Sequence, residues 1–162
     1  MNKKTFTAVA ILAATAVVFC ICFAFFGYKE KLVIYNGESK EIYGTYDIYD
    51  GMEFSVEFVH SVNKSPVRDC FVVRGNKLYA EKTVYSAFGA GVQTEIEEGQ
   101  TLTFDEDGNM VVEGFDTEFD KIKYIVGTVS DHLLTIEGKT VSMTEMCGKN
   151  AHVVFEIKRV RR

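Results

Sequence analysis

His60 and Ser61 stand side by side where an alternating apolar run gives way to a polar loop. A histidine beside a serine is the pair that serine hydrolases use, because the imidazole can remove the hydroxyl proton during nucleophilic attack. Adjacent strand residues point to opposite faces, however, and no glycine-flanked serine elbow is present. We therefore expect a binding or hydrogen-bonding role for this loop, and keep as the alternative a serine hydrolase that uses Ser61 or Ser86 with a histidine.

A second polar feature follows an expected strand at residues 85–91, where Ser86, Gly89 and Gly91 occur within six positions. Glycine adopts positive φ without steric cost, so successive backbone N–H groups can form a small anion-binding nest. A plain tight turn needs the same glycines. The segment therefore predicts either a ligand-binding turn or a purely structural one.

Metal ligation has little support in the sequence. The three histidines, His60, His132 and His152, lie far apart, and none of them has the short spacing typical of a metal site. Asp105, Asp107 and Asn109 stand around Gly108, but the distant glutamate of a calcium loop is missing, so a hairpin turn is the better interpretation. We expect no metal, no cofactor and no catalytic set.

Two of the four cysteines, Cys20 and Cys22, fall in a long apolar segment, which leaves Cys70 and Cys147 outside it. In an oxidising compartment this second pair can form one disulfide. Two buried thiols that pack as small hydrophobes are the alternative.

The apolar segment runs from Phe6 to Gly27 and contains no charged residue. As a helix it would reach roughly 33 Å, close to the ~30 Å hydrocarbon core of a bilayer. A cleaved signal peptide usually has a shorter apolar region and small residues at its end, whereas bulky Phe23, Phe25 and Phe26 stand here. We predict that residues 1–28 form a retained membrane anchor, or uncleaved signal sequence, and that residues 29–162 form one domain.

Lys3 and Lys4 precede the apolar segment, and positive charge tends to stay in the cytoplasm. The expected protein is thus a single-pass membrane protein with an extracytoplasmic C-terminal domain. Without these two lysines, 16 basic residues face 23 acidic ones, a balance of −7 that argues against a nucleic-acid partner. The basic cluster at 158–162 is either a solvated edge or a contact for anionic head groups or an acidic partner.

The sequence of the domain predicts an all-β fold, because apolar and polar residues alternate in short runs. Turns that contain glycine, asparagine or aspartate separate these runs. The clearest run, Met52 to Phe58, places four apolar side chains on one face. Residues 105–109 and 137–139 predict hairpin loops. We expect an antiparallel β-sandwich or partly open barrel without a useful amphipathic helix. The expected strands are Leu32–Tyr35, Met52–Phe58, Val67–Arg74, Lys77–Tyr85, Thr101–Phe104, Met110–Phe115, Lys121–Val126, Leu133–Ile136, Val141–Thr144 and His152–Val160.

The two polar features together resemble a known pattern. Residues 58–62, then Ser65-Pro66-Val67 with Asp69, then residues 85–91, resemble the bacterial domain-of-unknown-function family 1850 over Phe54 to Gly91. Asp69 stands where a glutamate is expected, and Val92-Gln93 stand where a proline often follows the glycines. The positions that match the family pattern are His60, Ser61, Pro66, Asp69, Ser86, Gly89 and Gly91.

This resemblance implies a context and no reaction, because members look like short exported or anchored proteins often associated with TAXI-type tripartite ATP-independent periplasmic (TRAP) transporters. The expected function is an accessory or ligand-binding domain. Its expected partners are membrane lipid through the N-terminal helix, TRAP transporter subunits and a small organic anion. The alternatives are a membrane-anchored serine hydrolase and a purely structural envelope protein. The candidate ligand or partner residues are His60, Ser61, Asp69, Ser86, Gly89 and Gly91.

Overall fold

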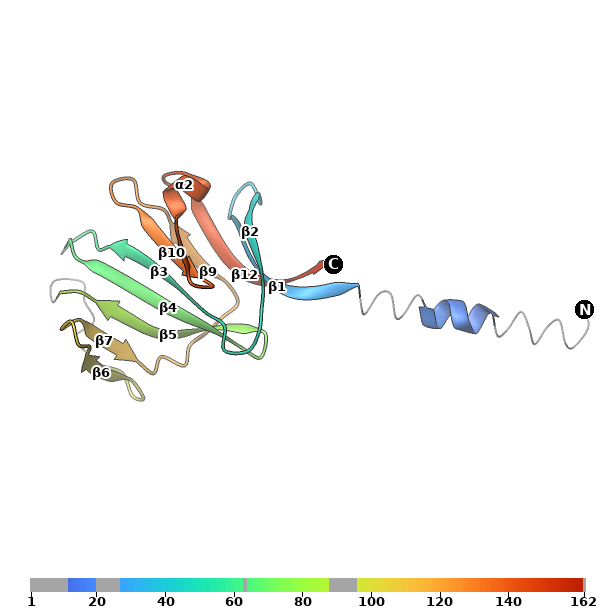
Figure 1. Cartoon of the computed structure of the whole chain (residues 1–162), viewed down its shortest axis with the longest axis horizontal. Coiled ribbons are helices and arrows are strands. Elements are labelled where there is room, and N and C mark those ends of the chain that lie inside the picture. The colour runs from blue at the N-terminus through green and yellow to red at the C-terminus, as the bar shows by residue number, and fades with distance from the viewer. Residues whose placement is uncertain (1–11, 20–26, 63, 88–95, 162) are drawn as a thin grey trace, which may run out of the picture.

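The computed structural model describes residues 12–19, 27–62, 64–87 and 96–161, and most of this chain is antiparallel β-structure (Figure 1). Residues 12–19 are helical, and a second helix, α2 (Met143–Cys147), follows the penultimate strand. The strands form two sheets, called here the small sheet and the large sheet.

The small sheet has the strand order β2-β1-β12-β9. Its central pair joins the first and last strands of the domain over their full length, from Tyr28 opposite Arg161 to Asn36 opposite Val153. The two ends of the domain therefore lie side by side in one sheet. The bounds are β1 (Tyr28–Asn36), β2 (Ile42–Asp47), β9 (Ile122–Ile125) and β12 (His152–Arg161).

The large sheet has the order β11-β10-β3-β4-β5-β7-β6, and the short β8 also pairs with β5. Its centre is the meander formed by β3, β4 and β5. In this meander each strand pairs with the next strand along the chain. The bounds are β3 (Glu53–Val59), β4 (Pro66–Arg74), β5 (Lys77–Tyr85), β6 (Thr101–Phe104), β7 (Met110–Glu113), β8 (Glu118–Phe119), β10 (His132–Ile136) and β11 (Lys139–Ser142).

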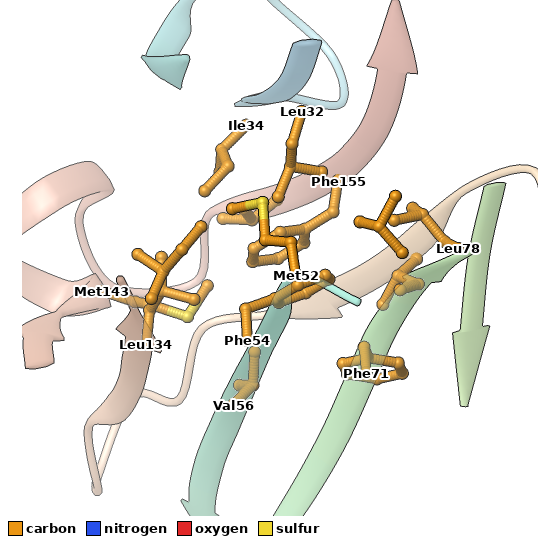
Figure 2. Packing of buried hydrophobic residues seen from close by; sticks show 14 of the residues in the cluster. Leu32, Ile34, Met52, Phe54, Val56, Phe71, Leu78, Leu134, Met143 and Phe155 are labelled. Carbon is orange, nitrogen blue, oxygen red and sulfur yellow. The ribbon is translucent and has the colours of Figure 1, made fainter. Parts of the chain in front are cut away.

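One apolar core lies between the two sheets (Figure 2). Strand alternation turns every second side chain inward, so Leu32 and Ile34 of the small sheet meet the inner face of the large sheet. Three aromatic rings hold the centre: Phe54 stacks on Phe71 at 5.2 Å between ring centroids and on Phe155 at 5.5 Å. Both antiparallel sheets bury side chains in this core, so the all-β class expected from the sequence is confirmed.

Both expected hairpins are present. Asp105 accepts hydrogen bonds from the backbone N–H groups of Asp107 and Asn109, which shapes the loop between β6 and β7. Glu137 and Gly138 have φ of 50° and 72°, the left-handed pair that a two-residue turn between β10 and β11 requires.

Three elements differ from the sequence prediction. Strands β2 and β8 were not predicted, and the strand expected at 141–144 gives way to α2 after Ser142. The Ser142 side chain accepts a hydrogen bond from the Glu145 backbone N–H, which is the usual way for serine to start a helix. Strand pairing with β1 and β5 determines β2 and β8, and a helix cap determines where α2 begins. Hydrophobic alternation does not indicate any of these three elements.

Of the two alternatives for Cys70 and Cys147, a disulfide or two buried thiols, the structure has both cysteines as free thiols. Cys70 lies in the middle of β4, opposite Ser55 and Lys82 of the neighbouring strands. The Cys147 thiol donates to the Met143 carbonyl, and burial raises the pKa of this thiol to about 11. Each cysteine thus packs as a small apolar side chain, the alternative considered above.

The predicted membrane anchor lies mostly outside the described residues, because only 12–19 and Gly27 of the segment 6–27 are described. Over the described ranges, none of the helices has the length and apolar character that crossing a bilayer would require.

Candidate functional site

A groove of about 520 Å³ opens at one end of the large sheet, between two loops. The first loop, residues 60–65, joins β3 to β4, and the second, residues 126–131, joins β9 to β10. The side chains that line it combine one ammonium group, two imidazoles and hydroxyl groups on an apolar floor. They are Phe58, Val59, His60, Ser61, Lys64, Thr128, Val129, Ser130 and His132, and Gly127 also contributes.

The first loop is held by backbone hydrogen bonds across its neck. His60 N–H donates to the Ser65 carbonyl at 2.9 Å, and Lys64 N–H donates to the His60 carbonyl at 3.0 Å. Lys64 has a φ of 59°, so the chain reverses there in a left-handed conformation. The Val62 N–H donates to His60 Nδ1 at 3.3 Å. These bonds fix the imidazole and the lysine backbone at the rim of the groove.

The second loop depends on the small size of Gly127. A Cβ at this position would lie 2.2 Å from the Ser130 carbonyl oxygen, closer than any real contact. The Gly127 N–H donates to His132 Nδ1 at 3.2 Å. Asp131 Oδ1 accepts from the N–H groups of His132 and Thr144, at 2.8 Å and 2.9 Å, which ties the loop to α2. Hydrogen bonds to the start of β10 and to α2 therefore fix the conformation of the second loop.

His132 is a half-buried polar group of the groove, packed between aromatic rings. Its ring stacks on Phe58 at 5.3 Å between centroids and meets the Tyr124 ring edge-on at 6.1 Å. Burial lowers the pKa of His132, and the Asp131 carboxylate opposes part of that change. Because Nδ1 accepts from Gly127, the neutral ring carries its proton on Nε2 and can donate it to a bound acceptor.

Asp69 lies next to this groove, on the inner face of the large sheet. Its carboxylate accepts from the Tyr124 hydroxyl at 2.8 Å and from Thr83 Oγ1 at 3.0 Å. Burial, and then the Asp69 charge, raise the pKa of Tyr124 well above its usual range, so the phenol remains a donor. Lys82, Lys121 and Lys123 line the same hollow of about 370 Å³.

Tyr124 joins the two places. Its ring lies 6.2 Å from Phe58 and 6.1 Å from His132, while its hydroxyl bonds to Asp69. A substitution of Asp69 that moves the Tyr124 ring would therefore also change the packing of Phe58 and His132 in the groove.

The structure gathers most of the predicted site residues at one end of the large sheet. His60 and Ser61 line the groove, and Asp69 lies behind it through Tyr124. The Ser86 N–H donates to the Pro66 carbonyl at 3.1 Å, which places the end of β5 beside the first loop. Gly89 and Gly91 lie outside the described residues.

A hydrolase arrangement is not found among the described residues, since neither Ser61 Oγ nor Ser86 Oγ bonds to a histidine ring there. The Nδ1 atoms of His60 and His132 already accept backbone N–H groups. A serine base needs a free ring nitrogen directed at the hydroxyl.

Sequence reasoning missed Lys64, Thr83, Tyr124 and Ser130. The only available signal for Tyr124 was its alternation with Lys123, which predicts an inward ring but says nothing of Asp69. His132 was noted as an isolated histidine, and its approach to the first loop follows from the pairing of Phe58 with His132.

A family model described as "Domain of unknown function (DUF1850)" matches residues 54–143. The chain belongs to the DUF1850 family. No curated protein and no solved structure matched it. The DUF1850 match reaches from β3 into the start of α2, well beyond the segment from Phe54 to Gly91 that carries the resemblance. It includes both groove loops, Asp69 and Tyr124.

The depressed pKa of His132 predicts acid sensitivity for this DUF1850 domain. The folded state favours the neutral ring, so its contribution to stability is complete above the unfolded pKa of about 6.5 and is lost as pH falls below it. Urea denaturation of the full chain at pH 7.5 and 5.5 should show a smaller loss for His132→Gln than for the wild type. His152→Gln makes the same substitution at a half-exposed histidine and is the control. Equal losses in His132→Gln and wild type would contradict this.

Proposed function

We propose that this DUF1850 chain is a membrane-anchored extracytoplasmic domain that binds a small organic anion and assists a TAXI-type TRAP solute transporter. The observation that carries the proposal is the groove between the two loops. One lysine, two histidines and several hydroxyl groups meet there without a nucleophile–base pair. Such a set can orient and neutralise an anion.

The groove offers polar groups for the carboxylate of a small organic anion and apolar surface for its carbon skeleton. Lys64 supplies the one ammonium group, while the Nε2–H of His132 and the hydroxyl of Ser130 supply neutral donors across the groove. Phe58 and Val59 supply apolar surface for the carbon skeleton of the anion. This division of polar and apolar groups is typical of small-molecule sites.

The membrane anchor is supported by the character of the first helical segment. Residues 6–27 contain no charge, and in the described helix the side chains of Leu12, Val17 and Phe19 are each more than half exposed. Apolar side chains with no protein surface over them favour a lipid environment. The short connection from Gly27 to β1 would then keep the groove domain close to the bilayer.

The test uses the full chain in uncharged detergent micelles. We expect thermal shift with mono- and dicarboxylates of two to six carbons to identify a binder, and Lys64→Gln to weaken it about tenfold, through loss of one charge-assisted hydrogen bond. Lys139→Gln is the matched control and should leave affinity unchanged, because Lys139 of β11 pairs with Ile136, at the end of β10 away from His132.

The transporter partner needs a separate measurement, namely affinity capture with the full chain from solubilised native membranes. A TRAP permease subunit should be retained by the wild type. If no carboxylate shifts the melting temperature and no transporter subunit is captured, the proposal is wrong. A binder whose affinity is the same in Lys64→Gln would place the site elsewhere.

A further inference from the structure

The two ends of the domain form a short projecting ribbon. Residues 28–31 of β1 pair with residues 158–161 of β12 in unbroken register. Figure 1 shows this pair reaching away from the body of the two sheets, with the C-terminus beside the start of β1. At roughly 3.3 Å per residue, the four residue pairs reach about 13 Å. We call residues 28–31 and 158–161 the basic ribbon.

The basic ribbon and the rest of the domain carry opposite charge. The ribbon has one acidic residue, Glu30, against five basic ones. Between residues 32 and 157, by contrast, lie 22 of the 23 acidic residues and 10 of the 18 basic residues, a balance of −12. An anionic surface would therefore attract the ribbon and repel the remainder of the domain. The five basic residues are Lys29, Lys31, Lys158, Arg159 and Arg161.

Cations occupy both faces of the basic ribbon. Leu32 and Ile34 point into the core, so strand alternation places Tyr28 and Glu30 on the same face beyond it. Arg161 lies opposite Tyr28, and Arg159 lies opposite Glu30. Lys29 and Lys31 fall on the other face. A strand pair that lay flat on a charged surface would need cations on one face only. Cations on both faces fit a ribbon whose tip enters a layer of anions.

Tyr28 adds a feature typical of a membrane interface. Its side chain is 46% exposed, and the Arg159 guanidinium lies 5.8 Å from its ring centroid. Tyrosine is enriched at the level of lipid head groups because its ring is apolar and its hydroxyl is polar. This residue directly follows the uncharged segment that ends at Gly27.

We infer that the basic ribbon docks on anionic lipid head groups where the chain leaves the bilayer, and so orients the acidic body and its groove away from the membrane. The inference rests on the membrane anchor of the proposed function. Lys31 and Lys158 already have counterions in Asp47 and Glu156, each at 3.1 Å. Lys29 and Arg159, one from each strand and each face, are the residues to change.

The experiment measures the melting temperature of the full chain in uncharged micelles doped with either phosphatidylglycerol or phosphatidylcholine. Because a ligand of the folded state stabilises it, phosphatidylglycerol should raise the melting temperature by about 2–5 °C relative to phosphatidylcholine. Sodium chloride at 0.5 M should remove the difference through screening. Lys29→Gln/Arg159→Gln should lose most of the shift, and Lys139→Gln/Lys149→Gln, with the same change of charge, should keep it.

The outcomes separate this inference from the anchor. A chain that is extracted only with detergent but shows no phosphatidylglycerol shift keeps the anchor and overturns the docking. A chain that fractionates without detergent but shows the shift overturns the anchor and keeps the docking. If polyglutamate in phosphatidylcholine micelles reproduces the shift in full, the ribbon is a site for an acidic protein and the lipid assignment is wrong.

Discussion

Replacing Phe155 with alanine should lower the free energy of unfolding by about 3–5 kcal/mol. Phe155 has no exposed surface, and its ring stacks on Phe54 and meets Tyr124 edge-on at 6.2 Å. It belongs to the small sheet while Phe54 belongs to the large sheet, so the cavity would open between the two layers, where neither sheet can close it alone. Urea denaturation of the full chain in detergent, followed by circular dichroism, measures the loss.

The control for this change is Val129→Ala. Val129 is 97% exposed at the rim of the groove, so shortening it should change the free energy of unfolding by less than about 0.5 kcal/mol. A Phe155→Ala variant that lost no more stability than this control would show that the two sheets are not held by a shared core. The sandwich interpretation would then be wrong.

Strands with one buried face could be predicted from the sequence, because alternation is a local property. In β3 the buried Phe54 and Val56 alternate with polar residues, and the predicted strand differs from the observed one by a single residue at each end. The first four residues of β1 have no such pattern. They are extended because β12 pairs with them, and such pairing of distant segments is not visible in local periodicity.

The same division applies to the site. The loop at 60–65 could be predicted, since histidine and serine stand out at a strand end. The second groove loop could not, because Gly127 matters only through a carbonyl three residues away and His132 only through its pairing opposite Phe58. The first groove loop is therefore visible in the sequence, whereas the second loop can be placed beside it only once the strand order is known.

The sequence left the pairing of Cys70 and Cys147 open for a related reason. Two exported cysteines suggest a bond only if the fold brings them together, and sequence spacing carries no such information. Cys70 lies on a central strand of the large sheet, whereas Cys147 ends a short helix that packs against the core.

Tyr124→Phe should lower the free energy of unfolding by about 1.5–3 kcal/mol, the usual worth of a hydrogen bond to a charged group. The phenyl ring can keep the packing against Phe58 and His132, so the loss isolates the 2.8 Å bond to Asp69. Tyr49→Phe is the control, because Tyr49 is 61% exposed and should lose less than about 0.5 kcal/mol. Anion affinity in the groove should stay within about twofold of the wild type, since Phe58, His132 and Lys64 are unchanged.

Alkaline pH gives an independent test of the same bond. Burial and Asp69 raise the pKa of Tyr124 in the folded state, so its stabilising contribution is present below the unfolded pKa of about 10 and is lost as pH rises above it. Between pH 9 and 11 the wild type should lose more stability than Tyr124→Phe. Tyr35, whose pKa is raised to about 12, titrates alike in both proteins and cancels in the comparison. Parallel pH curves would mean that the Tyr124 hydroxyl is solvated and that Asp69 is not coupled to the groove floor.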